Sequence, residues 1–115
     1  MIPCTFEDGR RAGLRHVVVR AVVERDGHLL LARHAAHLAD GGEWGLPGGF
    51  LDHNETMTDG VLRELLEETG WTGRVVTLLR VNSRPDQPQQ NVAFDFVVEP
   101  FEKLGEPDVE SSDVH

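Results

Sequence analysis

Residues 49–71 read GFLDHNETMTDGVLRELLEETGW, and this stretch decides the fold. Thr56, with Asp59 three residues later, resembles a capping box, and Gly70 is a typical helix stop, so a helix is expected between them. Four aliphatic residues recur at helical spacing and are expected to share its core-facing side: Val61, Leu62, Leu65 and Leu66. Gly60 inside this helix costs roughly 1 kcal/mol relative to alanine. Either its position has no room for a Cβ or the helix tolerates the loss.

Glutamates gather on the other side of the same predicted helix. Glu64, Glu67 and Glu68 stand at positions i, i+3 and i+4, within an arc of about 100° and opposite the leucines. Arg63 precedes Glu67 by four residues and can pair with it, and Glu55 enters from the preceding loop. Carboxylates this close repel one another unless cations lie between them, and hard divalent ions favour such oxygen ligands. The helix alone leaves two interpretations open, a metal site and a solvated acidic face.

The flanking sequence predicts strands and loops. Four segments rich in β-branched or aliphatic residues read as strands: 16–24, 28–33, 74–81 and 91–99. Asp26-Gly27 predicts a hairpin between the first two. Residues 35–55 are glycine-rich and irregular, and a loop of this length in a small domain usually carries function. The segment 91–99 alternates, which places Phe94 and Phe96 on a core face and Asp95 on the solvent face.

Composition limits the function classes. The 115 residues predict a single domain over residues 1–115. The net charge of −9 counts against extended nucleic-acid binding, which depends on Lys and Arg neutralising phosphates. The sequence has no apolar run long enough to span a membrane and no secretory signal at its start, and the single Cys4 cannot form an internal disulfide. We therefore expect a cytoplasmic protein that does not bind membranes.

The spacing of the glutamates extends to a longer pattern. Gly49 is followed after five residues by Glu55, and Glu55 after seven more by the run 63–71. This pattern resembles the signature of the Nudix hydrolase family. Trp71 stands where that signature usually has an aliphatic residue. The lead-in 44–49, Trp-Gly-Leu-Pro-Gly-Gly, is also similar to the family's pattern. The resemblance implies an α/β/α sandwich with a mixed β-sheet.

The resemblance also implies an activity. Nudix enzymes use Mg²⁺ or Mn²⁺ to hydrolyse the diphosphate linkage of a nucleoside diphosphate derivative, here ADP-ribose or a similar molecule, to a nucleoside monophosphate and a phosphorylated leaving group. One alternative is a house-cleaning nucleoside triphosphate pyrophosphohydrolase that releases pyrophosphate. Another is a non-catalytic nucleotide-binding sensor domain. The complete set of carboxylates favours an enzyme, and the motifs do not identify the substrate.

The family's site residues can be carried over to this sequence. The implied metal ligands are Gly49 through its carbonyl, Glu64, Glu67 and Glu68. Arg63 is expected to orient Glu67, and Glu55 to steady the cluster without binding the metal. The implied catalytic residues are Glu64, Glu67 and Arg63. The general base is expected to be Glu64, or a later carboxylate, of which the candidates are Asp95, Glu99, Asp108 and Glu110.

Two further residues are candidates for substrate binding. Trp44 can stack on a nucleobase or pack beneath the strands, and Arg84 can meet the distal part of a substrate. Pro85 and Pro88 straddle the position of a proline typical of ADP-ribose-cleaving members. The histidines lack the spacing of a metal triad, although three could reach a substrate phosphate: His34, His37 and His53.

The family's domains usually continue with another strand and a carboxy-terminal helix that covers one face of the sheet. This chain ends at His115, where that segment should begin. We therefore expect a domain truncated at its carboxy end, or a homodimer partner that shields the open face, because an uncovered apolar face promotes association.

Overall fold

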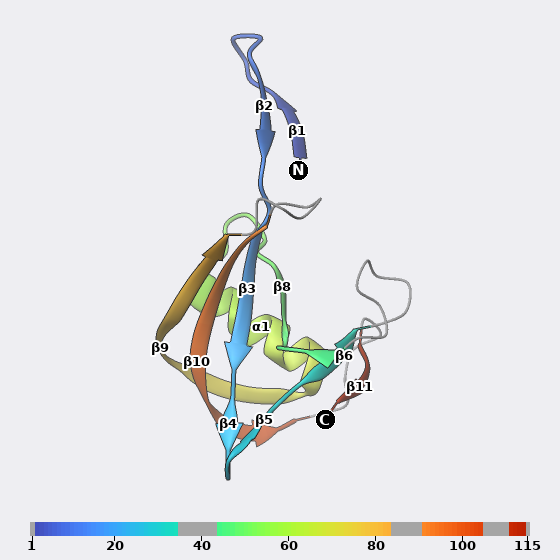
Figure 1. Cartoon of the computed structure of the whole chain (residues 1–115), viewed down its shortest axis with the longest axis vertical. Helices are drawn as coiled ribbons and strands as arrows, with labels where there is room; N and C mark the ends of the chain where they lie inside the picture. Colours follow the sequence, from blue (N-terminus) through green and yellow to red (C-terminus); the bar gives the residue numbers. More distant parts are fainter. Residues whose placement is uncertain (1, 35–43, 84–90, 105–110, 115) are drawn as a thin grey trace.

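The computed structural model describes residues 2–34, 44–83, 91–104 and 111–114. Its body is a four-stranded mixed sheet with one helix against it (Figure 1). The strand order is β8-β3-β10-β9, in which β3 (Val17–Val22) runs parallel to β10 (Val92–Lys103). The outer strands β8 (Gly48–Phe50) and β9 (Trp71–Ser83) are antiparallel to their neighbours. The predicted α/β class and mixed sheet are confirmed.

Helix α1 (Met57–Thr69) begins and ends where its caps predict. The Asp59 N–H donates to the Thr56 hydroxyl at 3.1 Å, and Gly70 adopts the left-handed conformation at φ 79° while its N–H donates to the Leu66 carbonyl. A Cβ on Gly60 would lie 2.7 Å from a methyl carbon of Leu51, so this position has no room for one.

The buried face of α1 differs from the prediction. Val61 and Leu65 are fully buried, but Leu66 is 40% exposed. Glu64 and Glu68 are buried in its place, at 7% and 4% exposure. At 100° per residue these two glutamates flank Val61 and Leu65 on one arc, whereas Leu66 lies outside it. The glutamates therefore share the packed side of the helix instead of standing opposite it.

The core lies between α1 and the sheet. Its fully or nearly buried members are Val19, Ala21, Val23, Val61, Leu65, Phe96 and Val98. Phe94 packs against this cluster, so the prediction of a phenylalanine stripe in the core is confirmed. Trp71 is half-buried beside it, with the Arg25 guanidinium 5.7 Å from its ring centroid.

The shorter strands modify the predicted pattern. The hairpin at Asp26-Gly27 is confirmed, with both residues at positive φ, and it joins β4 (Glu24–Arg25) to β5 (His28–Leu29). A second, three-stranded sheet has the order β11-β6-β7, formed by β11 (Ser111–Val114), β6 (Ala32–His34) and β7 (Trp44–Gly45). The prediction of an irregular segment over 35–55 is therefore wrong at β7 and β8, because both pair with strands distant in sequence.

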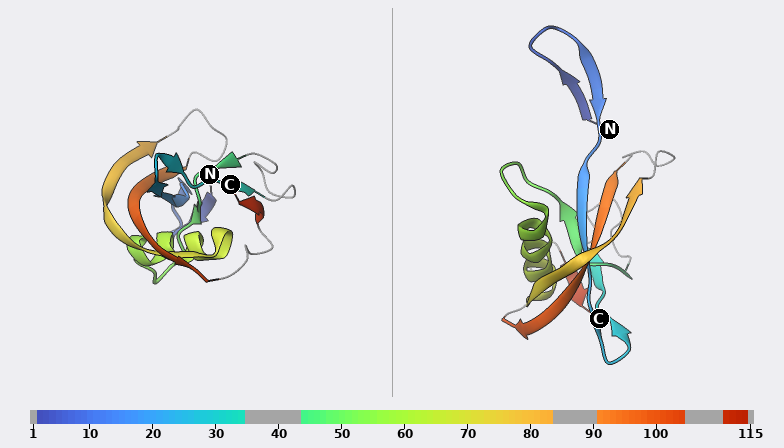
Figure 2. Two further views of the ribbon diagram at one scale, coloured as in Figure 1. Left: turned by 90° about the horizontal axis from the view of Figure 1, so that it is seen from below. Right: turned by 90° about the vertical axis from the view of Figure 1, so that its left-hand side faces the viewer.

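An amino-terminal hairpin was not predicted. Strands β1 (Ile2–Thr5) and β2 (Arg11–Leu14) pair with each other and project from the body (Figures 1 and 2). Gly9 has a φ of 86°, and the Asp8 carboxylate accepts a hydrogen bond from the Arg10 side chain. Asp8-Gly9 is the sequence signal that could have revealed this turn.

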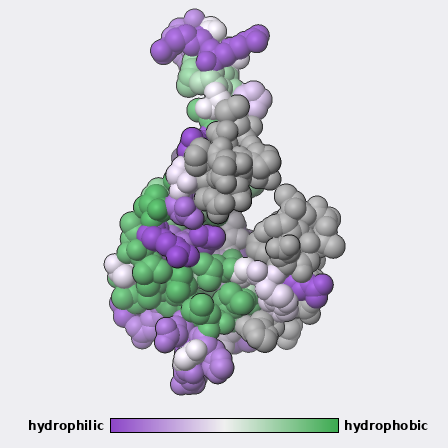
Figure 3. Space-filling view, viewed as in Figure 1, coloured by the Kyte–Doolittle hydropathy of each residue, from purple (hydrophilic) through white to green (hydrophobic). Residues whose placement is uncertain are grey.

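Helix α1 covers one face of the central sheet, and no other described helix or strand covers the opposite face (Figure 2). Viewed from that open side, the surface has an apolar region on the side where β9 and β10 lie (Figure 3). The second helical layer of an α/β/α sandwich is not found among the described residues. None of the helices that the structure describes is long and apolar enough to cross a membrane.

Candidate active site

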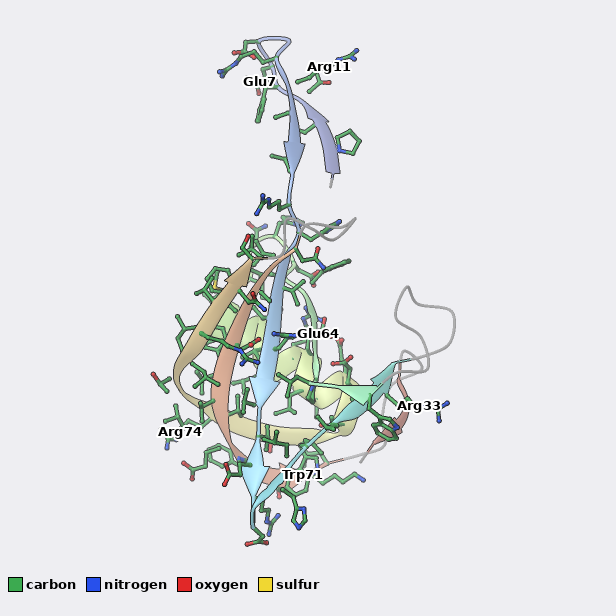
Figure 4. The ribbon with its side chains drawn as sticks, viewed as in Figure 1. Glu7, Arg11, Arg33, Glu64, Trp71 and Arg74 are labelled. Atoms are coloured by element: carbon green, nitrogen blue, oxygen red, sulfur yellow. The ribbon has the colours of Figure 1, made fainter. Side chains whose placement is uncertain are left out.

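Strand β8 lies beside α1, against the buried Glu64 (Figure 4). The Gly48 N–H donates to Glu68 Oε2 at 2.5 Å. A Cβ on Gly49 would lie 2.7 Å from the carboxylate atoms of Glu64, and one on Gly48 would lie 2.3 Å from the Val19 carbonyl oxygen. The absence of side chains at both glycines therefore lets the strand backbone approach the two carboxylates.

Arg63 connects three of the predicted carboxylates. Its Nε and Nη2 donate to the two oxygens of Glu55 at 2.7 and 3.2 Å. Its Nη1 donates to Glu64 at 2.9 Å and to Glu67 at 3.1 Å. Nη2 also donates to the Phe50 carbonyl. The predicted Arg63–Glu67 pair is thus present, and Arg63 also binds Glu55 and Glu64.

The contact between Arg63 and Glu55 favours the charged form of both side chains. The hydrogen bond from Arg63 holds the pKa of Glu55 below its ordinary value, and the Asp52 N–H contributes in the same direction against the effect of burial. The hydrogen bond to Glu55 raises the pKa of Arg63, and the charges of Glu64 and Glu67 add to this shift. Arg63 therefore remains a cation, which offsets part of the repulsion among the carboxylates.

The donor chemistry fits a hard divalent cation. Glu64 and Glu68 lie one helical turn apart, both are buried, and the Gly49 backbone lies against Glu64. All three supply oxygen, the ligand atom that Mg²⁺ and Mn²⁺ favour. As the side chains stand, the described part of the chain contains no group of three His, Cys, Asp or Glu residues that could hold a metal ion. Contacts to Arg63 and to the Gly48 N–H occupy these carboxylates, so an ion has to replace part of them.

The alternative general bases are less suitable or lie outside the described residues. Asp95 is fully buried and holds both Arg20 and Arg80, so its oxygens are already occupied. Glu99 is exposed and pairs with Arg74 at 2.6 Å. Asp108 and Glu110 lie outside the described residues.

The substrate-binding candidates have mixed outcomes. Trp44 lies in β7 and is 43% exposed. His53 is exposed, and His34 lies at the end of β6. Four other predictions cannot be placed because the residues lie outside the described ranges: His37, Arg84, Pro85 and Pro88.

One charged cluster was missed by the sequence analysis. Asp95, predicted to face solvent, has no exposed surface and lies between Arg20 and Arg80. The available signal was an arginine in the middle of the apolar run Val-Val-Val-Arg-Ala-Val-Val at 17–23.

Comparison with known proteins identifies the family. The NUDIX domain model matches residues 14–115. An ADP-ribose pyrophosphatase of Methanocaldococcus jannaschii is 39% identical over 71 residues, which are 62% of this chain and 41% of that protein. An 8-oxo-dGTP diphosphatase of Proteus vulgaris is 31% identical over 81 residues, 70% of this chain and 71% of that protein. A NUDIX hydrolase structure from Nitrosomonas europaea superposes with a TM-score of 0.79 at 29% identity, covering 93% of this chain and 60% of the other.

The NUDIX match thus includes β8, α1 and the carboxylates that Arg63 connects. The chain aligns with less than half of the Methanocaldococcus protein. The family model covers most of the chain, and the fold agrees with it. This chain belongs to the Nudix family.

Proposed function

We propose that this chain is a Mg²⁺- or Mn²⁺-dependent hydrolase that cleaves the diphosphate linkage of a nucleoside diphosphate derivative. The observation that carries the proposal is the burial of Glu64 and Glu68 against the paired glycines of β8. Burying two carboxylates costs free energy unless each is paired or binds a cation. Arg63 and the Gly48 N–H offset part of this cost, and a bound cation would offset more of it.

Each residue of the cluster has a proposed role. Glu64, Glu68 and the Gly49 carbonyl would hold the cation, and Glu67 would complete the set directly or through water. When bound, the cation offsets charge on the diphosphate oxygens and lowers the pKa of a water molecule. Arg63 positions Glu64 and Glu67 through its Nη1, and Glu55 fixes Arg63 from the other side.

The reaction requires a base for the attacking water. We assign this role to Glu64, because it lies against β8 in the cluster proposed to hold the cation, whereas Asp95 and Glu99 lie on β10 and bind arginines outside that cluster. Glu64 accepts a proton as the water oxygen forms a bond to one phosphorus. The bond from that phosphorus to the bridging oxygen breaks, and the second phosphate leaves with the bridging oxygen. With ADP-ribose the products are AMP and ribose 5-phosphate.

The substrate class has two candidates. ADP-ribose is favoured because a relative named ADP-ribose pyrophosphatase is 39% identical over 71 residues of this chain. A nucleoside triphosphate is the second candidate, because a relative named 8-oxo-dGTP diphosphatase aligns over 71% of its own length. In both, exposed Trp44 is proposed to stack on the base and Arg84 to contact the distal part of the substrate.

Products distinguish the candidates. Incubation with Mg²⁺ and ADP-ribose is expected to give AMP and ribose 5-phosphate, whereas a nucleoside triphosphate pyrophosphohydrolase gives pyrophosphate and a nucleoside monophosphate. Glu64→Gln and Glu68→Gln should abolish turnover, and Glu99→Gln, an exposed carboxylate outside the cluster, should not. Full turnover in either of the first two variants contradicts the proposal, and nucleotide binding without any turnover supports a sensor domain instead.

A further inference from the structure

Three charged side chains lie side by side across the central sheet. Asp95 of β10 is in register with Arg20 of β3 on one side and with Arg80 of β9 on the other. Arg20 donates to both carboxylate oxygens, Nε at 2.6 Å and Nη2 at 2.8 Å, and Arg80 donates through Nε. Val19 and Ala21 pack in the core against α1, so Arg20 between them points to the opposite, open face of the sheet.

The cluster carries a net positive charge. Two guanidinium groups share one carboxylate, and Asp95 stays ionised in this setting. Burial alone raises the pKa of Asp95, but hydrogen bonds from Arg20 and Arg80 outweigh that effect and lower it. A fixed charge of +1 therefore lies on the open face of a protein whose net charge is −9.

The buried carboxylate of Asp95 does not require Arg80 as a second partner. Arg20 already binds Asp95 through two nitrogens, the geometry in which an arginine pairs fully with a carboxylate. Arg80 contacts Asp95 only through Nε, its side chain is 57% exposed, and its Nη1 and Nη2 have no partner among the described residues. The Asp95 contact limits the motion of this side chain, so a ligand that binds the two terminal nitrogens pays less conformational entropy.

A pair on the same strand provides a contrast. Arg74 of β9 is 58% exposed and pairs with Glu99, which is itself 53% exposed. That pair is a neutral contact of one cation with one anion at the surface. The Arg20–Asp95–Arg80 cluster differs in having its anion buried and its second cation unbalanced.

The cluster lies near the candidate active site. In the sheet, Arg20 is in register with Gly48, whose N–H binds Glu68. Strand β8 is one edge of the sheet, and Arg20 lies on the strand next to it.

We propose that Arg80, with the positive charge of Arg20 beside it, forms a binding site for an oxyanion of the phosphate class. The forked donors of arginine match phosphate oxygens in geometry and charge. The phosphate comes either from the nucleotide substrate or from free inorganic phosphate. Only the first source depends on the proposed function.

The direct test is a titration of the metal-free protein with inorganic phosphate, followed by NMR of the arginine Nε–H signals. Saturable shifts of two signals are expected in the wild type and in Arg74→Gln, the matched control on β9. In Arg80→Gln one of these signals should disappear, and affinity should fall at least about tenfold because charge-assisted hydrogen bonds are lost. Absence of saturable shifts, or unchanged affinity in Arg80→Gln, overturns the site.

Arg80→Gln should remain folded, because Asp95 keeps both hydrogen bonds from Arg20. A thermal unfolding curve checks this. Arg80→Lys retains the charge but loses the forked donors, so its phosphate affinity should lie between those of the wild type and Arg80→Gln. Equal phosphate affinity in Arg80→Lys and the wild type contradicts recognition by the forked donors of the guanidinium.

Kinetics identify the source of the phosphate. If the site holds the substrate, Arg80→Gln raises KM more than it lowers kcat. If KM stays unchanged while phosphate binding is lost, free inorganic phosphate is the ligand of the same site. These results are separate from the proposed function, which fails if Glu64→Gln and Glu68→Gln keep full turnover.

Discussion

Arg63 holds Glu55 through two nitrogens, Nε at 2.7 Å and Nη2 at 3.2 Å, while its third nitrogen reaches Glu64 and Glu67. One side of the guanidinium is thus anchored to the loop before α1. The other side faces the carboxylates proposed for metal binding. A change at Glu55 should therefore act on the site through Arg63.

Glu55→Gln is expected to lower kcat by about tenfold to a hundredfold, the usual range for a residue that positions a metal ligand. The amide can accept one hydrogen bond from Arg63 but cannot balance its charge. Steady-state kinetics with Mg²⁺ measure this effect, and Asp59→Asn, an exposed acid in the first turn of α1, is the control. A loss confined to KM contradicts the positioning role.

Substitutions of Gly48 and Gly49, the two glycines of β8, are expected to cause different defects. Gly49→Ala places a Cβ against the carboxylate of Glu64, the flexible end of a side chain, so the protein should fold while metal affinity falls. Gly48→Ala places a Cβ 2.3 Å from the Val19 carbonyl oxygen, which is backbone, and should destabilise the protein by about 1–3 kcal/mol. Denaturant unfolding and metal titration separate the two effects. Equal metal affinity in Gly49→Ala and the wild type contradicts the placement of Glu64.

The lowered pKa of Asp95 predicts part of the pH dependence of the protein's stability. Its pKa in the folded protein lies below the ordinary value of 3.8, because the hydrogen bonds from Arg20 and Arg80 outweigh burial. The ionised carboxylate therefore adds stability at pH values above 3.8, and this stability is lost as the pH falls through the lower folded pKa. Glu55, whose folded pKa is also lowered, acts in the same direction.

Asp95→Asn is expected to lower the free energy of unfolding at neutral pH by about 3 kcal/mol, because it leaves Arg20 partly buried without a counter-charge. Denaturant unfolding between pH 7 and pH 2 should show a smaller decline for this variant than for the wild type. A parallel decline in both proteins means that Asp95 does not contribute as proposed.

Local sequence signals predicted the parts of the fold that depend on local chemistry. Thr56 and Gly70 mark the ends of α1 because their caps are made within one helical turn. The hairpin at Asp26-Gly27 follows from two residues that accept positive φ. The Arg63–Glu67 pair follows from helical spacing.

Contacts between distant segments could not be predicted in the same way. Glu64 and Glu68 are buried because β8 packs beside them, and β8 in turn is held by pairing with β3. The amino-acid sequence alone placed these glutamates on the solvent side and Leu66 in the core. Asp95 was misplaced for a similar reason, since its burial depends on arginines from two other strands.

The most direct test of the central claim is a calorimetric titration of the protein with Mn²⁺ and Mg²⁺. The account predicts saturable binding in the wild type, loss of that binding in Glu64→Gln and Glu68→Gln, and retention in Glu99→Gln. Absence of binding in the wild type, or unchanged binding in both cluster variants, would contradict a metal site between α1 and β8.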